Sequence, residues 1–158
     1  MKDLALVGIR RGGEPLARRL AAVIRELEGV EPPVGSIDIT LYRDDAATAL
    51  PNPRIGPSNI PFEVNGRRIV LVDDVLYTGR TIRAAVDAVL DYGRPRRIEL
   101  VVLVDRGGRE LPIQADYAVR TVDVGADQRV EVRETTPGSG ELCAVLASAA
   151  GPTSEPVP

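Results

Sequence analysis

Four stretches of the chain have the hydrophobic pattern of β-strands. Leu4–Ile9, Ile69–Val72 and Arg97–Val104 are almost continuously apolar, which is typical of strands that are buried on both faces of a sheet. Ser36–Tyr42 instead alternates between apolar and polar positions, the pattern of a strand with one buried face. We therefore expect the continuous runs to form the centre of a sheet.

Two segments carry apolar residues at helical spacing. Between Glu14 and Glu28, the apolar positions 16, 20, 23 and 27 are separated by four, three and four residues, and charged residues occupy the other faces. Thr81–Tyr92 has a similar apolar stripe and is followed by Gly93, a residue type that commonly ends helices. Because strands and helices alternate, the pattern predicts an α/β fold with a mainly parallel sheet covered by helices on both faces. Short strands at Asp116–Val119 and Arg129–Arg133 are expected to complete this sheet.

Two segments interrupt the periodic pattern. Asp44–Pro61 contains prolines at positions 51, 53, 57 and 61, which disfavour both a helix and a central strand. A long stretch of this kind inside a compact domain is usually a functional loop or a disordered one. After Glu134 the chain is rich in Pro, Gly, Ser and Thr, so we expect residues 135–158 to form a disordered tail, apart from a short apolar patch at Leu142–Ala150. This divides the chain into one domain of residues 1–134 and the tail.

The composition excludes several kinds of chemistry. The 158 residues include no histidine, which excludes histidine acid–base catalysis and histidine-ligated metals, and the single Cys143 excludes an intrachain disulfide. The formal net charge of −3 argues against a globally basic nucleic-acid-binding protein. No apolar run is long enough to cross a membrane and the first residues do not resemble a signal peptide, so we expect a cytoplasmic location.

Asp73 and Asp74 end an apolar strand and are followed by a turn that leads into a helix. In a parallel sheet, ligands bind beyond the carboxyl ends of the strands, where these carboxylates are expected to lie. Gly79 permits a tight turn, Thr78 and Thr81 offer hydroxyl groups, and the helix start offers free N–H groups, which together favour a phosphate. Carboxylates repel a phosphate but accept hydrogen bonds from the vicinal hydroxyls of a ribose. The segment therefore predicts a site for a ribose 5-phosphate, the alternative being a plain strand–helix turn.

The segment Val70–Thr81, which reads VLVDDVLYTGRT, resembles the phosphoribosyl-pyrophosphate (PRPP) motif of type I phosphoribosyltransferases. Together with Asp38–Asp45 (DITLYRDD) and Val104–Ile113 (VDRGGRELPI), it is similar to the pyrimidine operon attenuator/uracil phosphoribosyltransferase (PyrR) family over residues 4–133. The resemblance implies a type I phosphoribosyltransferase-like fold, with a mainly parallel five-stranded sheet flanked by helices. It also implies a small hood formed by the chain ends and a flexible flap at Ala46–Pro61.

The resemblance implies a role for each matching residue. Asp73 and Asp74 would bind the ribose hydroxyls and Arg43 would face the pyrophosphate, and these three would be the catalytic residues. Arg106 would lie near the nucleotide. The 5′-phosphate would be wrapped by Val75, Leu76, Tyr77, Thr78, Gly79, Arg80 and Thr81. The pyrophosphate loop would contain Arg10, Arg11 and Gly12.

The sequence departs from the family pattern in several places. The family usually has Thr-Arg-Gly in the pyrophosphate loop, whereas residues 11–13 read Arg-Gly-Gly, so Arg10 or Arg11 would have to supply the missing charge. Gly108 stands where the family's Arg-Gly-His-Arg has its histidine. Arg120–Gly125 replaces the family's Lys-Asn-Ile-Pro-Thr-Ser, so this segment differs in sequence from the family at a position linked to base recognition. The family normally has a helical segment before the first strand, so we expect a truncated start or a reduced hood.

The implied reaction transfers the phosphoribosyl group of PRPP to uracil, giving UMP and pyrophosphate. Magnesium would accompany PRPP, and the base that accepts the uracil proton is left open, with a carboxylate near the site as one candidate. Two alternatives remain: an RNA-binding, nucleotide-sensing regulator with little catalysis, and a phosphoribosyltransferase for another base such as orotate or a purine. Arg18, Arg19, Arg25 and Arg94–Arg97 are the clusters that pyrimidine operon leader RNA could contact, so we expect weak binding at best, which a homodimer would strengthen.

Overall fold

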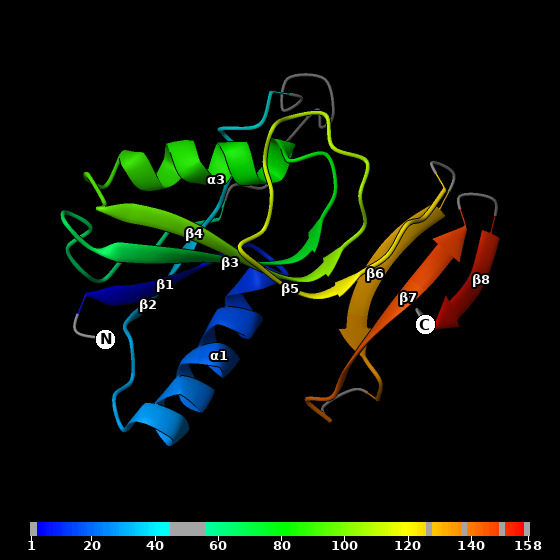
Figure 1. Cartoon of the computed structure of the whole chain (residues 1–158), viewed down its shortest axis with the longest axis horizontal. Coiled ribbons are helices and arrows are strands. Elements are labelled where there is room, and N and C mark those ends of the chain that lie inside the picture. Colours follow the sequence, from blue (N-terminus) through cyan, green and yellow to red (C-terminus); the bar gives the residue numbers. More distant parts are fainter. Residues whose placement is uncertain (1–2, 45–55, 126–127, 137–138, 149–150, 157–158) are drawn as a thin grey trace.

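The computed structural model describes residues 3–44, 56–125, 128–136, 139–148 and 151–156, and the structural statements below concern these residues. They form a larger parallel sheet with helices on its faces and a smaller antiparallel sheet beside it (Figure 1). Within them, no helix is long and apolar enough to cross a membrane.

The larger sheet contains five parallel strands in the order β2-β1-β3-β4-β5. The strands are β1 (Leu4–Ile9), β2 (Val34–Ile37), β3 (Arg68–Leu76), β4 (Arg97–Asp105) and β5 (Tyr117–Thr121). β3 lies at the centre, where Val72 pairs with Gly8 of β1 on one side and with Val101 of β4 on the other. The predicted α/β class and the mainly parallel five-stranded sheet are confirmed, because the continuously apolar runs occupy the positions buried on both faces.

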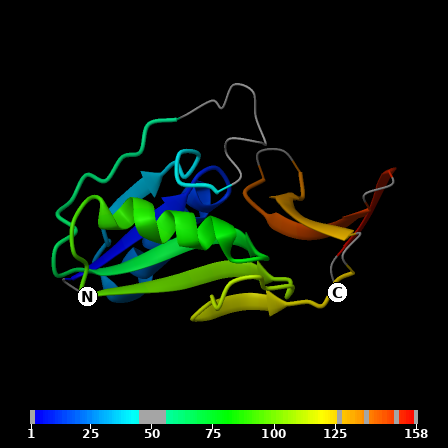
Figure 2. The same cartoon turned by 90° about the horizontal axis from the view of Figure 1, so that it is seen from above.

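Helices α1 (Gly13–Glu28) and α3 (Arg80–Leu90) cover opposite faces of this sheet, as Figures 1 and 2 show. Ala17 and Ala21 of α1 are fully buried, so the helix packs closely against β1 and β3. Side chains of β1 alternate between the two faces, as a strand requires. Leu4 and Leu6 lie in the core under α1, whereas Ala5, Val7 and Ile9 lie in the core under α3 with Ile82, Ala85 and Val89 of that helix.

The smaller sheet corrects two predictions. β6 (Gln128–Glu134) was expected, as Arg129–Arg133, to complete the larger sheet, but it pairs antiparallel with β7 (Leu142–Ser148) in a separate sheet. β7, which is the apolar patch of the tail, pairs in turn with β8 (Gly151–Pro156), so residues 151–156 form a strand where disorder was expected. The physical reason is that β6 meets the apolar patch of the tail. Val130 of β6 pairs with Leu146 of β7, and Val130 and Val145 are both buried. The patch therefore gives β6 an apolar partner strand. This sheet is built entirely from the C-terminal part of the chain.

β2 ends earlier than its alternating pattern predicts. The strand expected over Ser36–Tyr42 ends at Ile37, because the Asp38 carboxylate accepts hydrogen bonds from the backbone N–H and the hydroxyl of Thr40, at 2.9 Å and 2.5 Å. A side chain that bonds its own backbone two residues on makes a turn in place of a strand. Residues 40–42 therefore leave the sheet and cross towards α3.

Residues 56–61, at the end of the predicted flap, lie against β2. Asn59 and Ser36 exchange two backbone hydrogen bonds of 2.8 Å and 2.7 Å, and the Ser58 hydroxyl accepts the Asp38 N–H at 2.9 Å. The remainder of the predicted flap, residues 46–55, lies outside the described residues.

Candidate functional site

Asp73 and Asp74 lie near the carboxyl end of the central strand, inside β3 and not after it as the sequence suggests. Asp73 is only 6% exposed and accepts the Asp74 N–H at 3.0 Å, while the Asp74 carboxylate accepts the Val75 N–H at 2.8 Å. Burial, and then the neighbouring Asp74 charge, raise the pKa of Asp73 well above its ordinary value. The pair therefore presents hydrogen-bond acceptors to any hydroxyl groups that lie beyond the end of β3.

The turn between β3 and α3 lines a cavity of about 340 Å³. Gly79 precedes α3 with φ +90°, a conformation that favours glycine, and as the N-cap residue it has no side chain to cap the helix. The Thr78 hydroxyl accepts the Arg80 N–H at 3.3 Å, and the other N–H groups of the first helical turn lie beside the cavity, which is favourable for a phosphate. The cavity is lined by Arg43 and Glu110 together with all seven residues of the predicted phosphate loop, Val75, Leu76, Tyr77, Thr78, Gly79, Arg80 and Thr81, and by Ile82.

Arg80 differs from the other residues of this loop because two carboxylates already bind it. Its Nε donates to Glu110 at 2.6 Å, and its Nη1 is ion-paired with Asp44. The guanidinium thus joins the chain on either side of the cavity, from the segment that carries Arg43 to the loop after β4. Arg80 therefore connects the two sides of the cavity. The groups that could bind a phosphate there are the backbone N–H groups and the threonine hydroxyls of the loop.

The loop after β1 lies directly against the aspartate pair. A Cβ at Gly12 would overlap the Asp74 carboxylate, 2.6 Å from its Cγ, so position 12 has no room for a side chain in this arrangement. A Cβ at Gly13 would overlap the backbone of Val72. The peptide bond between Arg10 and Arg11 is cis. The predicted pyrophosphate loop and the predicted ribose-binding pair are therefore adjacent in space.

Arg10 and Arg11 line a second cavity, of about 520 Å³, with Glu14, Pro15, Arg18, Asp38 and Gly56. Arg10 is held on two sides, by the Glu14 carboxylate at 3.0 Å and by the Pro57 carbonyl at 2.8 Å. Hydrogen bonds from Arg18 and Arg10 lower the pKa of Glu14, so this carboxylate is charged near neutral pH. Arg11 is exposed beside this pair. Arg10 and Arg11 thus lie on the side of Gly12, which contacts Asp74, whereas Arg43 lines the cavity of the phosphate loop.

Arg106 lies at the end of β4 with its guanidinium 3.7 Å from the centre of the Tyr77 ring. It is 6% exposed, its Nη2 donates to the Gly125 carbonyl at 3.5 Å, and its Nε has no hydrogen-bond partner among the described residues. Gly108, with φ +72°, allows the Tyr77 ring to lie where a side chain at 108 would stand. The stacked pair lies next to the phosphate loop, and the nucleotide contact predicted for Arg106 stays a prediction.

Arg109 fixes the loop after β4 against the phosphate loop. Its guanidinium donates to the Tyr77 and Ile113 carbonyls, both at 2.8 Å, and to the Asp105 carboxylate at 2.5 Å. Burial alone would raise the pKa of Asp105, but the hydrogen bonds from Arg109 and the Gly107 N–H outweigh it and lower that pKa. Sequence reasoning missed this contact, and it also missed Glu14 and Glu110. The spacing of four residues between Asp105 and Arg109, and between Arg10 and Glu14, was the available signal.

The chain matches a family model described as phosphoribosyl transferase domain over residues 1–135. It is 58% identical over 133 residues to a Bifunctional protein PyrR of Roseiflexus sp. (strain RS-1), covering 84% of this chain and 73% of the relative. It is 54% identical over 148 residues to a Bifunctional protein PyrR of Listeria welshimeri, covering 92% of this chain and 81% of the relative.

Among solved structures, a hypoxanthine phosphoribosyltransferase from Trypanosoma cruzi, a K68R mutant complexed with the product IMP, is similar with a TM-score of 0.62. The two chains are 19% identical, and the match covers 88% of this chain and 65% of that one, so it supports the fold alone. The family resemblance predicted from the motifs is confirmed. The aspartate pair, the phosphate loop and the parallel sheet that carries them thus occur in a chain that belongs to the phosphoribosyl transferase domain family and, within it, to the bifunctional PyrR proteins.

Proposed function

We propose that this phosphoribosyltransferase converts uracil and PRPP to UMP and pyrophosphate. The observation that carries the proposal is the position of the buried Asp73 and the half-buried Asp74 between the phosphate loop at the start of α3 and the arginine-bearing loop after β1. PRPP carries a 5′-phosphate, the ribose hydroxyls and a pyrophosphate on C1′. These three polar groups follow one another in the same order as the phosphate loop, the aspartate pair and the arginine-bearing loop. Membership of the PyrR proteins supports uracil as the acceptor.

In the proposed reaction, the C1′–N1 bond to uracil forms as the C1′–O bond to pyrophosphate breaks, and the bonding electrons leave with pyrophosphate. The first turn of α3 would bind the 5′-phosphate through its N–H groups. Asp73 and Asp74 would accept hydrogen bonds from the ribose hydroxyls and stabilise positive charge that develops at C1′. Arg43 and Arg11 would stabilise the leaving pyrophosphate through charge-assisted hydrogen bonds. The proton of uracil N1 must pass to an acceptor, for which Asp74 is one candidate.

Magnesium fits this site as an ion that arrives with PRPP. Among the described residues, no group of three or more acidic or cysteine side chains could hold a metal by itself. Mg²⁺ is commonly bound by one or two carboxylates together with substrate phosphates and water, and Asp73 and Asp74 supply such carboxylates. When bound, the ion would neutralise charge on the pyrophosphate. Titration of PRPP binding with and without Mg²⁺ would test this assignment.

The identity of the base rests on the Arg106–Tyr77 surface. Arg106 offers a guanidinium that could donate to a carbonyl oxygen, and uracil has two such oxygens. Orotate and hypoxanthine also carry carbonyl groups, so the acceptor is best identified by measuring pyrophosphate release from PRPP with uracil, orotate, hypoxanthine and guanine. We expect uracil to give the highest kcat/KM. A preference for a purine or orotate of tenfold or more would replace uracil as the substrate.

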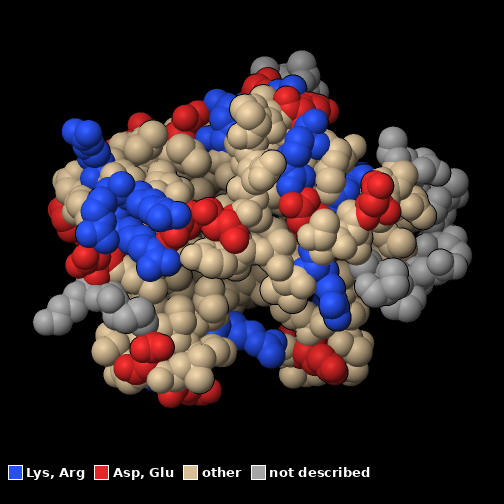
Figure 3. All heavy atoms as spheres, in the orientation of Figure 1, with Lys and Arg blue, Asp and Glu red and all other residues tan. Residues whose placement is uncertain are grey.

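We also propose a second, regulatory function, in which the protein binds pyrimidine operon leader RNA weakly. It would do so as a homodimer in the cytoplasm. The α1 arginines are mostly compensated: Arg18 pairs with Glu14 at 2.9 Å and Arg25 pairs with Glu31 at 3.2 Å. Figure 3 shows positive side chains interleaved with negative ones, with a basic group where β3 and β4 begin. There, Arg96 and Arg97 also have carboxylate partners. Most arginines of these two clusters thus have carboxylate partners, which leaves fewer positive charges for RNA phosphates and favours catalysis as the main activity.

A further inference from the structure

One face of α3 holds the segment 42–44 at three points. Arg80, Arg83 and Asp91 are separated by three and eight residues, so they lie along one side of the helix. The apolar residues Ile82, Ala85 and Val89 take the opposite side and are buried in the core. The polar side of α3 is therefore free to bind another segment of the chain.

The first two contacts hold Tyr42. Arg83 Nη2 donates to the Tyr42 carbonyl at 2.6 Å, and the Tyr42 hydroxyl donates to the Asp91 carboxylate. That hydrogen bond, and then burial, raise the pKa of the Tyr42 phenol, so the phenol keeps its proton near neutral pH. Arg83 is itself held by Asp87 at 2.7 Å. Backbone and side chain of Tyr42 are thus fixed independently by one helix.

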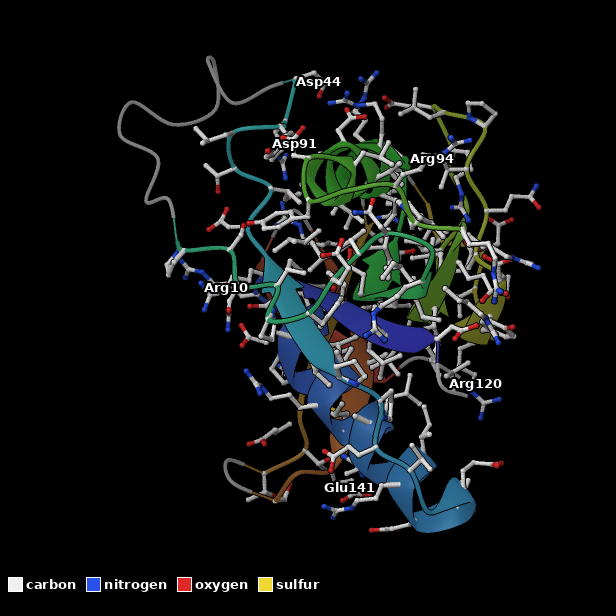
Figure 4. All side chains as sticks on the ribbon, turned by 90° about the vertical axis from the view of Figure 1, so that its left-hand side faces the viewer. Arg10, Asp44, Asp91, Arg94, Arg120 and Glu141 are labelled. Carbon is white, nitrogen blue, oxygen red and sulfur yellow. The ribbon has the colours of Figure 1, made fainter. Side chains whose placement is uncertain are left out.

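The third contact is the ion pair between Arg80 and Asp44. Figure 4 shows Asp44 and Asp91 on the same side of α3. Arg43 lies between the two held residues and lines the cavity of the phosphate loop. The start of the same helix forms that phosphate loop, so α3 fixes the distance between Arg43 and the site for the 5′-phosphate.

We propose that Tyr42, Arg83 and Asp91 are positioning residues that act on the phosphoribosyl donor through Arg43. This inference rests on the proposed function, since it takes PRPP as the ligand that Arg43 contacts. Holding Tyr42 and Asp44 on either side limits the positions that the Arg43 guanidinium can take, which reduces the freedom that must be lost when pyrophosphate binds.

The inference predicts a defined kinetic pattern. Tyr42→Phe removes only the hydroxyl that bonds Asp91, and we expect KM for PRPP to rise about tenfold while KM for uracil changes less than about twofold. Arg83→Met should have the same effect, and Arg83→Lys, which keeps a donor for the Tyr42 carbonyl, should restore part of the loss. Tyr92→Phe, at an exposed tyrosine just after the same helix, is the matched control and should leave both constants unchanged.

A double-mutant cycle separates positioning from a general structural effect. In an Arg43→Gln background, Tyr42→Phe should cost less than about twofold, because the residue through which it acts is gone. An equal loss in both backgrounds, or no loss in the wild-type background, would overturn the inference. The dissociation constant for PRPP, measured by calorimetry, should follow the same pattern as KM. This measurement also allows a variant to be compared when its turnover is too slow to assay. Failure of wild type to bind or turn over PRPP would instead count against the proposed function.

Discussion

The guanidinium of Arg106 is stacked on the ring of Tyr77, 3.7 Å from its centre, and the two residues come from loops that follow different strands of the central sheet. Tyr77 directly follows β3 and belongs to the phosphate loop, whereas Arg106 directly follows β4. The contact therefore links the part of the site that would bind the phosphoribosyl group to the part that would bind the base.

Arg106→Met should weaken use of the base and spare use of the donor. Methionine keeps an apolar contact with the ring but removes the cation and its donors, so we expect KM for uracil to rise by about tenfold with KM for PRPP little changed. Steady-state kinetics with each substrate varied in turn would measure both constants. Arg67→Met provides the control, because Arg67 lies over the Phe62 ring at 5.7 Å, at the opposite end of the sheet. Equal effects on the two KM values would contradict the assignment.

Replacement of Asp73 or Asp74 by Asn should lower turnover at least about tenfold, because the amide keeps the shape but removes the charge. Pyrophosphate release at saturating uracil would measure the loss. Wild-type turnover in both variants would show that the carboxylates do not serve the reaction.

The same Asp73→Asn variant should be more stable than the wild type at higher pH. Because burial raises the pKa of Asp73, the folded protein binds this proton more tightly than the unfolded chain does. The free energy of unfolding therefore falls as pH rises from the ordinary carboxyl pKa through the raised value. Asn does not titrate, so this loss is absent from the variant. Thermal unfolding at pH of about 4 and about 8 should show the variant's advantage growing with pH; an advantage that shrinks would refute the burial argument.

Gly12→Ala should impair activity through a direct collision. The added methyl group would overlap the Asp74 carboxylate, so either the loop after β1 or the aspartate must move, and we expect kcat/KM to fall about tenfold or more. Gly66→Ala is the comparison, because φ there is +71° but nothing lies within 4 Å of the new Cβ. It should cost some stability and leave activity intact. Comparable activity of the two variants would show that the loop tolerates a side chain at position 12.

Binding to a pyrimidine operon leader hairpin should be weak and should fall steeply with salt, because most arginines on α1 already have protein partners. Titration at two salt concentrations with UMP present would measure both affinity and slope. Nanomolar, sequence-selective binding at physiological salt would contradict this prediction and favour the RNA-binding regulator as the main function.

The parts of the fold predicted from the sequence are those whose information is local. The run from Ile69 to Thr81 contains a buried strand, two carboxylates and a glycine turn in order, so its structure follows from neighbouring residues. β6 was assigned to the wrong sheet because a short alternating segment does not specify its partner, which here is the apolar patch of the tail. Arg80 was expected on phosphate, but its carboxylate partners are 36 and 30 residues away in sequence. Contacts of that kind depend on the folded chain, and no local pattern encodes them.

The attachment of residues 42–44 to α3 limits how the length of this helix can change in evolution. Inserting one residue between Arg83 and Asp91 would rotate the Asp91 side chain by about 100° and shift it by about 1.5 Å along the axis. Tyr42 would then lose one of its two partners while the start of the helix stayed in place. We therefore expect insertions and deletions among homologous sequences to fall outside residues 80–91, even where the helix surface is exposed to solvent.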